Sequence, residues 1–202
     1  MASIFSQVTP LTRRIRTADR DIQSVEFLEC ARQVLPIIDK FGTGFMMVKS
    51  DISGNIERLA QRQATDASKF RLLFSIVTDE VERGEHTGAY SCTKGLLWLT
   101  RALQFLTDLL RRLYEDRAIA VSTAASDAYY ATLHQYHGWI TSSAFILALK
   151  LAPSREGFFA KLGTPGEQMM TEMKEFLDAF VPFLTDSHMF LKEHGLDDPT
   201  KV

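Results

Sequence analysis

The chain has 202 residues, a length typical of one domain, and its 46% hydrophobic and 24% charged residues exclude a disordered chain. The net charge of −2 argues against a nucleic-acid-binding protein, which needs a concentrated basic surface. No run reaches the roughly 18 consecutive apolar residues of a membrane-spanning helix. Two cysteines, Cys30 and Cys92, fit a reducing compartment, so we expect a cytoplasmic protein.

Residues 1–24 are interpreted as a polar lead-in. The segment holds four arginines, but Asp19 and Asp21 stand among them, and a transit peptide is usually poor in acids. Residues 25–202 are expected to form the single folded domain.

From about residue 25 onward, apolar residues recur with a helical period. They predict a helix over about 25–38, in which Pro36 should cause a bend or a break, and another over about 45–63. A third helix is expected over about 66–82, with Asp66 as its N-cap. The glycine-containing stretch RGEHTGAY then predicts a loop.

The second half of the chain is also helical in pattern. GLLWLTRALQFLTDLLRRLY is apolar on nearly every side, which predicts a central, buried helix over about 91–114. A helix capped near residue 122 should run to about His137, followed by a further apolar helix and a short one. The last helix is expected over about 166–194, with a kink at Pro182. No segment alternates like a strand, so the sequence predicts one all-α domain.

The apolar residues exceed what one face of each helix needs. The chain contains 14 Phe and 7 Met, and several helices are apolar over more than one face. These residues fill a helical core, or some of them line a cavity for a long hydrocarbon ligand around which Met and Phe can repack. Composition alone favours the core.

Three polar residues on the second predicted helix lie next to its apolar stripe. At 100° per residue, Asp51, Asn55 and Arg58 fall within an arc of about 60° that borders the apolar stripe. Gly54 lies beside them and could leave room for a bulky group. The simpler interpretation is a solvated helix edge with a weak Asp–Arg contact.

Two further polar sets stand in apolar helices. Lys94 and Trp98, four residues apart, share a face of the central helix, where a tryptophan is usually part of the core but can also stack under a sugar ring. His137 and Trp139 flank a glycine, and a lone histidine is more often structural. His134 and His137 lack a third ligand nearby, so no metal or other cofactor is expected.

Together these segments resemble the glycolipid transfer protein family. The resemblance rests on KSDISGNI (49–56), LLWLTRALQF (96–105), YHGWI (136–140) and LKLAP (149–153), with weaker similarity in FLECARQVLPIIDKFG (27–42) and PSREGFFAKL (153–162). It implies an all-α fold of about eight helices in a two-layer sandwich that encloses a hydrophobic lipid pocket. It also implies non-enzymatic transfer of glycosphingolipids, such as glucosyl- or galactosylceramide, between membranes.

The resemblance also implies roles for single residues. Asp51 would accept hydrogen bonds from the ceramide amide N–H and from sugar hydroxyls, and Asn55 would bond sugar hydroxyls. Trp98 would stack under the first sugar, and His137 would donate to the ceramide carbonyl, so that both halves of the buried amide are satisfied. Trp139 matches a tryptophan that the family uses for membrane docking.

An apolar sleeve is needed because moving about 30 methylenes from a bilayer into water costs roughly 24 kcal/mol. The expected lining residues are Phe45, Leu103, Phe105, Phe145, Phe158, Phe176, Phe180 and Phe183. We expect the protein to act as a monomer that contacts membranes only transiently.

The sequence departs from the glycosylceramide pattern of the family at three places. Arg58 stands where glycolipid-selective members usually have lysine, and Lys94 is basic, whereas Asn55 and Trp98 follow the sugar-binding pattern. The alternative is therefore transfer or sensing of ceramide-1-phosphate or another anionic sphingolipid. The chain ends PTKV without the tyrosine that some members place there, which argues against closure of the pocket from that end.

Overall fold

A computed structural model describes residues 2–202 and leaves Met1, the first residue of the expected lead-in, outside the described residues. Within this range the chain forms nine α-helices, two short 3₁₀ helices and no strand, which confirms the expected all-α fold. The helices are α1 (Ile4–Thr12), α2 (Ser24–Asp39), α3 (Met46–Thr65), α4 (Leu73–Glu82), α5 (Cys92–Glu115), α6 (Val121–Thr132), α7 (Trp139–Leu149), α8 (Arg155–Leu162) and α9 (Glu167–Glu193), and the 3₁₀ helices are η1 (Thr43–Phe45) and η2 (His134–Tyr136).

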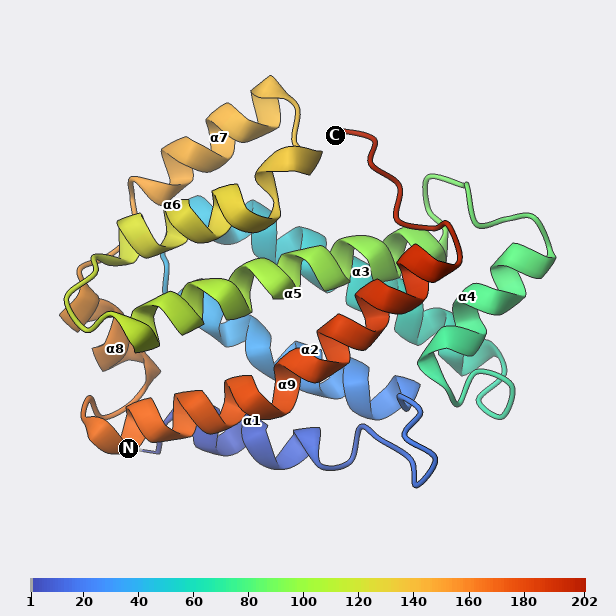
Figure 1. Cartoon of the computed structure of the whole chain (residues 1–202), viewed down its shortest axis with the longest axis horizontal. Coiled ribbons are helices and arrows are strands. Elements are labelled where there is room, and N and C mark those ends of the chain that lie inside the picture. Colours follow the sequence, from blue (N-terminus) through green and yellow to red (C-terminus); the bar gives the residue numbers. More distant parts are fainter. Residues whose placement is uncertain (1) are drawn as a thin grey trace.

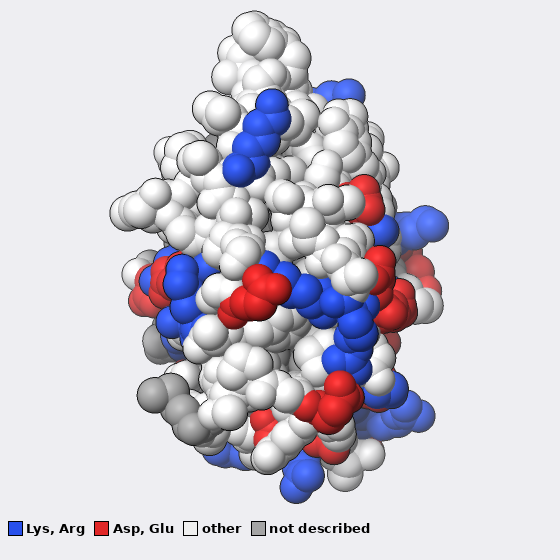
Figure 2. Space-filling view, turned by 90° about the vertical axis from the view of Figure 1, so that its left-hand side faces the viewer, with Lys and Arg blue, Asp and Glu red and all other residues white. Residues whose placement is uncertain are grey.

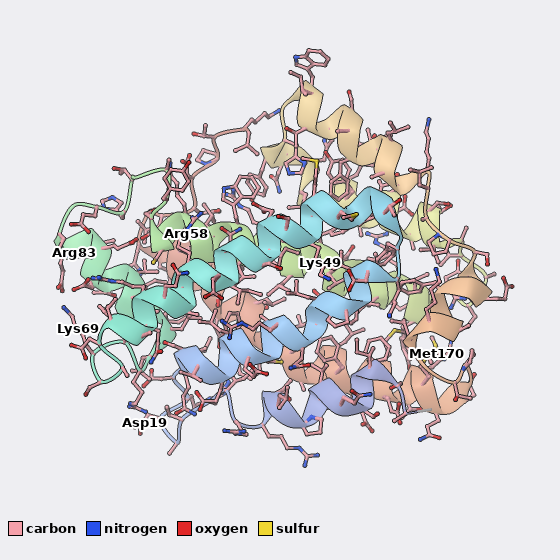
Figure 3. The ribbon with its side chains drawn as sticks, turned by 180° about the vertical axis from the view of Figure 1, so that it is seen from behind. Asp19, Lys49, Arg58, Lys69, Arg83 and Met170 are labelled. Carbon is pink, nitrogen blue, oxygen red and sulfur yellow. The ribbon has the colours of Figure 1, made fainter. Side chains whose placement is uncertain are left out.

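The long helices form two layers. α9, α5 and α6 lie side by side in the front layer of Figure 1, and α1, α2 and α3 form the layer behind them. The view from behind shows α1, α2 and α3 in front of α5 and α9 (Figure 3). α5 is central because it packs against α3, α6 and α9, and α7 lies apart at the upper edge of the molecule (Figure 1).

The start of α5 is fixed by a carboxylate from α4. Ser91 caps the helix, its Oγ accepting from the Lys94 N–H at 3.1 Å. The buried Glu80 carboxylate accepts from the backbone N–H groups of Cys92 at 2.7 Å and Thr93 at 2.8 Å. A carboxylate at a helix N-terminus satisfies free N–H groups and favours the helix dipole. The rotation of α5, and hence the direction of its side chains, is thereby anchored.

The N-terminal segment is not a polar lead-in. Residues 4–12 form α1, which packs on α2 and α9, and Phe5 and Val8 are buried in the main core. Ile15 and Ile22 beyond the helix are buried as well. The arginines and aspartates make one face of this segment polar, whereas the apolar residues spaced along it pack into the core and attach it to the domain.

Neither proline breaks its helix. Pro36 lies inside α2 and Pro182 inside α9, and both helices continue through them. Buried residues precede and follow each proline, among them Val34 and Ile37 in α2, and Phe180 and Phe183 in α9. Packing on both sides therefore outweighs the loss of one backbone hydrogen bond.

Two predicted helix boundaries are wrong. Asp66 does not cap α4: its N–H donates to the Gln63 carbonyl at the end of α3, and α4 begins only at Leu73. The helix expected to reach His137 ends at Thr132, and its N-cap is Ala120. Hydrophobic period alone does not separate a helix end from a following turn, and boundaries are the least certain part of such predictions.

Candidate functional site

Two adjoining cavities lie between α3, α5, α7 and the C-terminal segment. The polar cavity, of about 310 Å³, is lined by Asp51, Asn55, Arg58, Ala89, Lys94, Leu97, Trp98, Arg101, Asp198, Thr200 and Val202. The apolar cavity, of about 400 Å³, is lined by Gly44, Met47, Val48, Asp51, Trp98, Ala102, Leu133, His137, Thr141, Ala144, Phe145, Ala148 and Val202. The two share Asp51, Trp98 and Val202, so the six expected headgroup residues all line one continuous site.

The polar face of α3 contributes three of these residues. Asn55 is buried, and its Nδ2 donates to the Asp51 carboxylate at 3.4 Å. Arg58 projects from α3 where this helix crosses α5 (Figure 3), and its Nη1 donates to the Ser91 carbonyl at 3.2 Å. Asp51 and Arg58 make no direct ion pair, which leaves the Asp51 carboxylate free to accept further hydrogen bonds.

The Asp51 side chain is exposed, yet its carboxylate is partly desolvated by the walls of the site. The surrounding walls withdraw enough water to raise the pKa of Asp51 above its ordinary value, and the charge of Arg58 opposes part of that rise. Desolvation also strengthens any hydrogen bond that the carboxylate makes. A carboxylate of this kind suits the recognition of N–H and O–H donors.

Gly54 has open space beside it, since a Cβ placed on it meets nothing within 4 Å, but it is exposed and is not among the residues that line the two cavities. The glycine that permits close packing here is Gly95 of α5, where a Cβ would lie 3.4 Å from the Arg58 side chain. The periodicity of α3 located the face correctly, but only the packing partner reveals which glycine the site needs.

On α5, Lys94 and Trp98 face the site together. The Trp98 ring lies roughly parallel to the His137 ring, with centroids 6.1 Å apart and planes at 22°, and meets Tyr136 edge-on at 6.4 Å. Trp98 is only half-buried, so part of its face remains open to the cavities. A flat ring held by neighbours on one side is a suitable platform for a ligand on the other.

His137 is positioned by a buried hydroxyl. Its Nδ1 lies 3.1 Å from the Tyr129 Oη, which donates to the Ser142 Oγ at 3.0 Å. Burial lowers the pKa of His137, and nearby His134 lowers it further, so the ring is neutral at pH 7. The Tyr129 hydroxyl has one hydrogen, so while it donates to Ser142 its oxygen accepts from Nδ1–H; if it turns to donate to Nδ1, the proton of the neutral ring is on Nε2, which is then a donor.

Arg101 is a site residue that the sequence analysis missed. It lines the polar cavity although only 2% of it is exposed, and its guanidinium lies 3.4 Å from the centre of the Tyr136 ring. Its Nη2 donates to the carboxylate of Asp197 and the carbonyl of Asp198. A local signal was present: Arg101 stands three residues after Trp98 and seven after Lys94, on the same face of α5 as both.

The C-terminal segment closes one side of the site, contrary to expectation. Val202 donates to the Tyr136 carbonyl at 3.0 Å and accepts from the Gly138 N–H at 2.7 Å. Asp198, Thr200 and Val202 line the polar cavity. Closure here depends on backbone hydrogen bonds, which the absence of a tyrosine does not affect.

Three of the expected apolar lining residues lie beside the apolar cavity. Phe145 lines it, and Phe45 and Phe105 meet Phe145 edge-on with centroids 6.0 and 5.3 Å away. Phe45 and Phe105 also border an inner cavity of about 10 Å³, lined further by Ile38, Phe41, Val48, Ile52, Ala102 and Leu106. This inner space is the size of one water molecule.

The other expected lining residues occupy different places. Phe176 and Phe180 stack at 5.2 Å, and they pack on Phe5 and Phe27 between α1, α2 and α9. Phe183 belongs to the same cluster, Phe158 packs on Phe41 at 4.5 Å, and Leu103 is buried without lining a described cavity. Phe158 thus reaches the inner cavity only through Phe41, whereas Phe176, Phe180 and Phe183 lie in the core between α1, α2 and α9.

Trp139 is exposed and stands in an apolar surface. It is 79% exposed at the start of α7, and Met47, at the mouth of the apolar cavity, is 83% exposed. Other large exposed apolar side chains of α7 and its surroundings are Met46, Ile140, Leu147 and Leu151. Figure 2 shows that the upper end of the molecule, where α7 lies, is largely uncharged, with basic but no acidic side chains on this face. Among the described residues, no helix is long and apolar enough to cross a bilayer, and no acid–histidine–cysteine cluster could hold a metal.

Comparison with known proteins agrees with this geometry. The sequence profile of the glycolipid transfer protein (GLTP) family matches residues 22–164. The chain belongs to the glycolipid transfer protein family. It is 40% identical to Glycolipid transfer protein 1 of Arabidopsis thaliana over 196 residues, which cover 97% of this chain and 96% of that protein.

Solved GLTP-fold structures place the whole chain in this family. The GLTP-fold structure of FAPP2, described as selecting simple glycosphingolipids, is 33% identical and covers 100% of both chains with a TM-score of 0.92. Human ceramide-1-phosphate transfer protein, solved with 12:0 ceramide-1-phosphate, has a TM-score of 0.85 over 95% of this chain. At 20% identity the latter shows only a common fold.

Proposed function

We propose that this protein transfers neutral glycosphingolipids between membranes, and that it releases them chemically unchanged. The observation that carries the proposal is the pair of adjoining cavities, one polar and one apolar, that share Asp51 and Trp98. A glycosylceramide has a sugar, an amide and hydrocarbon chains in the same order. The site offers hydrogen-bonding groups, an amide-binding pair and apolar walls in that order.

In this proposal the polar cavity binds the sugar. Asp51 accepts from the ceramide amide N–H and sugar hydroxyls, and Asn55 and Arg58 bond the remaining hydroxyls. Trp98 stacks under the first ring, and Lys94 stands at the outer edge. Asn55 and Trp98 favour a neutral sugar, because an amide and an indole ring do not neutralise a phosphate.

His137 would complete the binding of the ceramide amide. Its Nε2–H becomes available as a donor when Tyr129 turns its hydroxyl hydrogen from Ser142 to Nδ1, and the ceramide carbonyl needs such a donor once it leaves water. Asp51 and His137 both line the apolar cavity. One amide could therefore meet both groups, which would also anchor every sphingolipid irrespective of its headgroup.

The hydrocarbon chains require the apolar cavity to widen. A space of about 400 Å³, with an inner cavity of only about 10 Å³, is smaller than two long chains need. We expect Phe45, Phe105 and Phe145 to move apart as the chains enter, since aromatic contacts made edge-on can be replaced by contacts with methylenes. α7 is the element best suited to move, because only Ser142, Phe145 and Leu149 of it are buried.

Docking would occur through the apolar surface around α7. Trp139 and Met47 flank the mouth of the apolar cavity, and an indole ring is favoured at the membrane interface. A carrier that docks there would let the lipid pass from bilayer to cavity without crossing water. The protein would thus be a cytosolic monomer that binds membranes peripherally and transiently.

Two alternatives remain distinct. Arg58, Lys94 and Arg101 could bind an anionic headgroup, which favours a ceramide-1-phosphate carrier as the second candidate. A lipid sensor that presents itself to protein partners would use the same site but need not transfer lipid quickly.

The test is a vesicle-to-vesicle transfer assay with glucosylceramide, galactosylceramide, sulfatide and ceramide-1-phosphate side by side. We expect fast transfer of the two neutral lipids, and mass spectrometry should recover them unchanged. A preference for ceramide-1-phosphate would overturn the headgroup assignment. Binding without transfer would favour the sensor, and altered lipid would reveal an enzyme.

A further inference from the structure

The C-terminal segment after α9, residues 195–202, crosses the polar cavity. It leaves α9 at Gly195, which has a φ of 69°, and the Leu196 N–H donates back to the Leu191 carbonyl at 2.8 Å. From there it runs over the first half of α5 to the connection between α6 and α7 (Figure 1). Its far end is bonded to Tyr136 and Gly138. The segment therefore spans the site and is held at both ends.

A buried cation, Arg101, fixes the position of the C-terminal segment relative to α5. The Nη2 of Arg101 lies 2.8 Å from the Asp197 carboxylate and 2.7 Å from the Asp198 carbonyl. Arg101 cannot swing away, because it is 2% exposed and lies against the Tyr136 ring. Removing such a group from a buried pair is costly, since its partners lose their charge-assisted hydrogen bonds.

As a result, the Asp198 side chain lines the polar cavity. Its Oδ1 accepts from the Thr200 N–H at 2.9 Å. The hydrogen bonds from Thr200, followed by the charges of Lys94 and Arg101, lower the pKa of Asp198 below its ordinary value. The carboxylate is therefore ionised at neutral pH, with acceptor positions left for other donors.

We propose that Asp198 is a charge-selecting residue of the headgroup site, which accepts sugar hydroxyls and repels sulfate or phosphate groups. The inference rests on glycolipid transfer as the function and names the neutral class within it. Three cations and two carboxylates line the polar cavity. Arg101 is already paired with Asp197, so without the charge of Asp198 the cations Arg58 and Lys94 face only Asp51, and an anionic headgroup becomes favourable. Specificity here comes from a repulsive element as much as from attractive ones.

The residue explains how a site with Arg58, Lys94 and Arg101 can prefer an uncharged sugar. Asp51 lies at the junction with the apolar cavity, where the ceramide amide would occupy it. Asp198 lines the polar cavity but not the apolar one, so it would face the part of the headgroup farther from the ceramide amide. A sulfate on the sugar would meet this carboxylate at short range.

The experiment compares galactosylceramide with sulfatide, which differ by one sulfate, mixed in the same donor vesicles. Because both lipids leave the same vesicle, docking affects them equally and the ratio of their transfer rates reports headgroup selection. We expect Asp198→Asn to raise the ratio of sulfatide to galactosylceramide about tenfold. Asn retains an oxygen for the Thr200 N–H, so the segment should stay in place.

Two matched variants separate charge from structure. Asp198→Glu keeps the charge and should keep the wild-type ratio. Glu193→Gln removes the same charge from an exposed residue at the end of α9 and should also leave the ratio unchanged. Circular dichroism confirms that each variant is folded.

Each outcome decides between the inferences. An unchanged ratio in folded Asp198→Asn, or an equal rise in Asp198→Glu, overturns charge selection and leaves the transfer function standing. A wild-type protein that transfers neither lipid overturns the proposed function, and charge selection with it.

Discussion

On the α1–α9 side of the sandwich, Phe176 stacks on Phe180 at 5.2 Å and lies 5.9 Å from Phe5, and all three rings are fully buried. On the α3–α7 side, Phe145 meets Phe105 edge-on at 5.3 Å and borders a cavity of about 400 Å³. The same residue type therefore forms a closed core on one side and an open wall on the other.

The difference lies in the neighbouring elements. Phe176 belongs to a long helix that packs along both α1 and α5, so its ring has partners all round. Phe145 belongs to the short helix α7, which packs mainly on α6 and η1 and buries only Ser142, Phe145 and Leu149. A helix with so few buried contacts opens at low free-energy cost, and lipid-binding elements need this property.

Replacing one phenylalanine by alanine on each side should give the largest difference in stability between the two sides. We expect Phe176→Ala to lower the free energy of unfolding by about 3–5 kcal/mol, because the closed core cannot collapse around the missing ring. Phe145→Ala should cost only about 1–2 kcal/mol, since it already borders an open space. Urea denaturation measures both, and equal losses would contradict the contrast between closed core and open wall.

The headgroup end of the open side should respond in function and not in stability. Asp51→Val is expected to lower glycolipid transfer about a hundredfold, because the ceramide amide loses its acceptor and a charged hydrogen-bonding group is removed. Its melting temperature should stay close to that of the wild type, since the Asp51 side chain is exposed. Transfer at the wild-type rate by a folded variant would refute the site assignment.

The surface of α7 can be tested by itself. Trp139→Ala should reduce partitioning to phospholipid vesicles about tenfold, because a large exposed ring no longer enters the interface. Met189→Ala, which removes an exposed apolar side chain from α9, is the control and should not change partitioning. Sedimentation with vesicles measures this, and equal behaviour of the two variants would argue against docking through α7.

A smaller effect is expected from Tyr129, which contacts His137 but does not itself line either cavity. Tyr129→Phe removes the hydroxyl that lies 3.1 Å from His137 Nδ1 and keeps the ring packed on Phe145. Without it, no hydroxyl can donate to Nδ1 and favour the Nε2–H form of His137, and transfer should fall several-fold, or about 1 kcal/mol. A wild-type transfer rate in Tyr129→Phe would mean that the hydroxyl does not position the histidine.

The smallest effect should appear in the pH dependence of stability. Burial lowers the pKa of His137 in the folded state, so the unfolded chain takes up a proton first as the pH falls below about 6.5. Stability should therefore decrease from pH 7 toward pH 5, and this slope should be shallower in His137→Gln. Equal slopes would show that the open wall imposes no cost on charging this ring.

The predictable parts of the molecule are those that local spacing determines. Asp51, Asn55 and Arg58 share a face because they are three and four residues apart, and no tertiary information is needed to see it. The same holds for Lys94 and Trp98. The family resemblance then placed His137 beside them, which the structure also does.

The unpredicted parts depend on contacts between distant segments. Nothing local indicates that Asp198 returns to a cavity formed by α3 and α5, or that Arg101 holds it there. Phe176 and Phe180 were assigned to the lipid sleeve because a helical stripe gives the spacing of apolar residues but not the helix that they face. α1 escaped notice for a similar reason, since its few apolar residues become meaningful only beside α9.

The way the C-terminal segment is attached has an evolutionary consequence. Arg101 bonds the backbone carbonyl of Asp198, and Val202 exchanges two backbone hydrogen bonds with Tyr136 and Gly138. These attachments do not depend on which side chains the segment carries at positions 198 and 200. Substitutions there can change the headgroup that a carrier accepts while the helical scaffold keeps its stability. New lipid preferences can therefore arise in this fold by single mutations outside the helices.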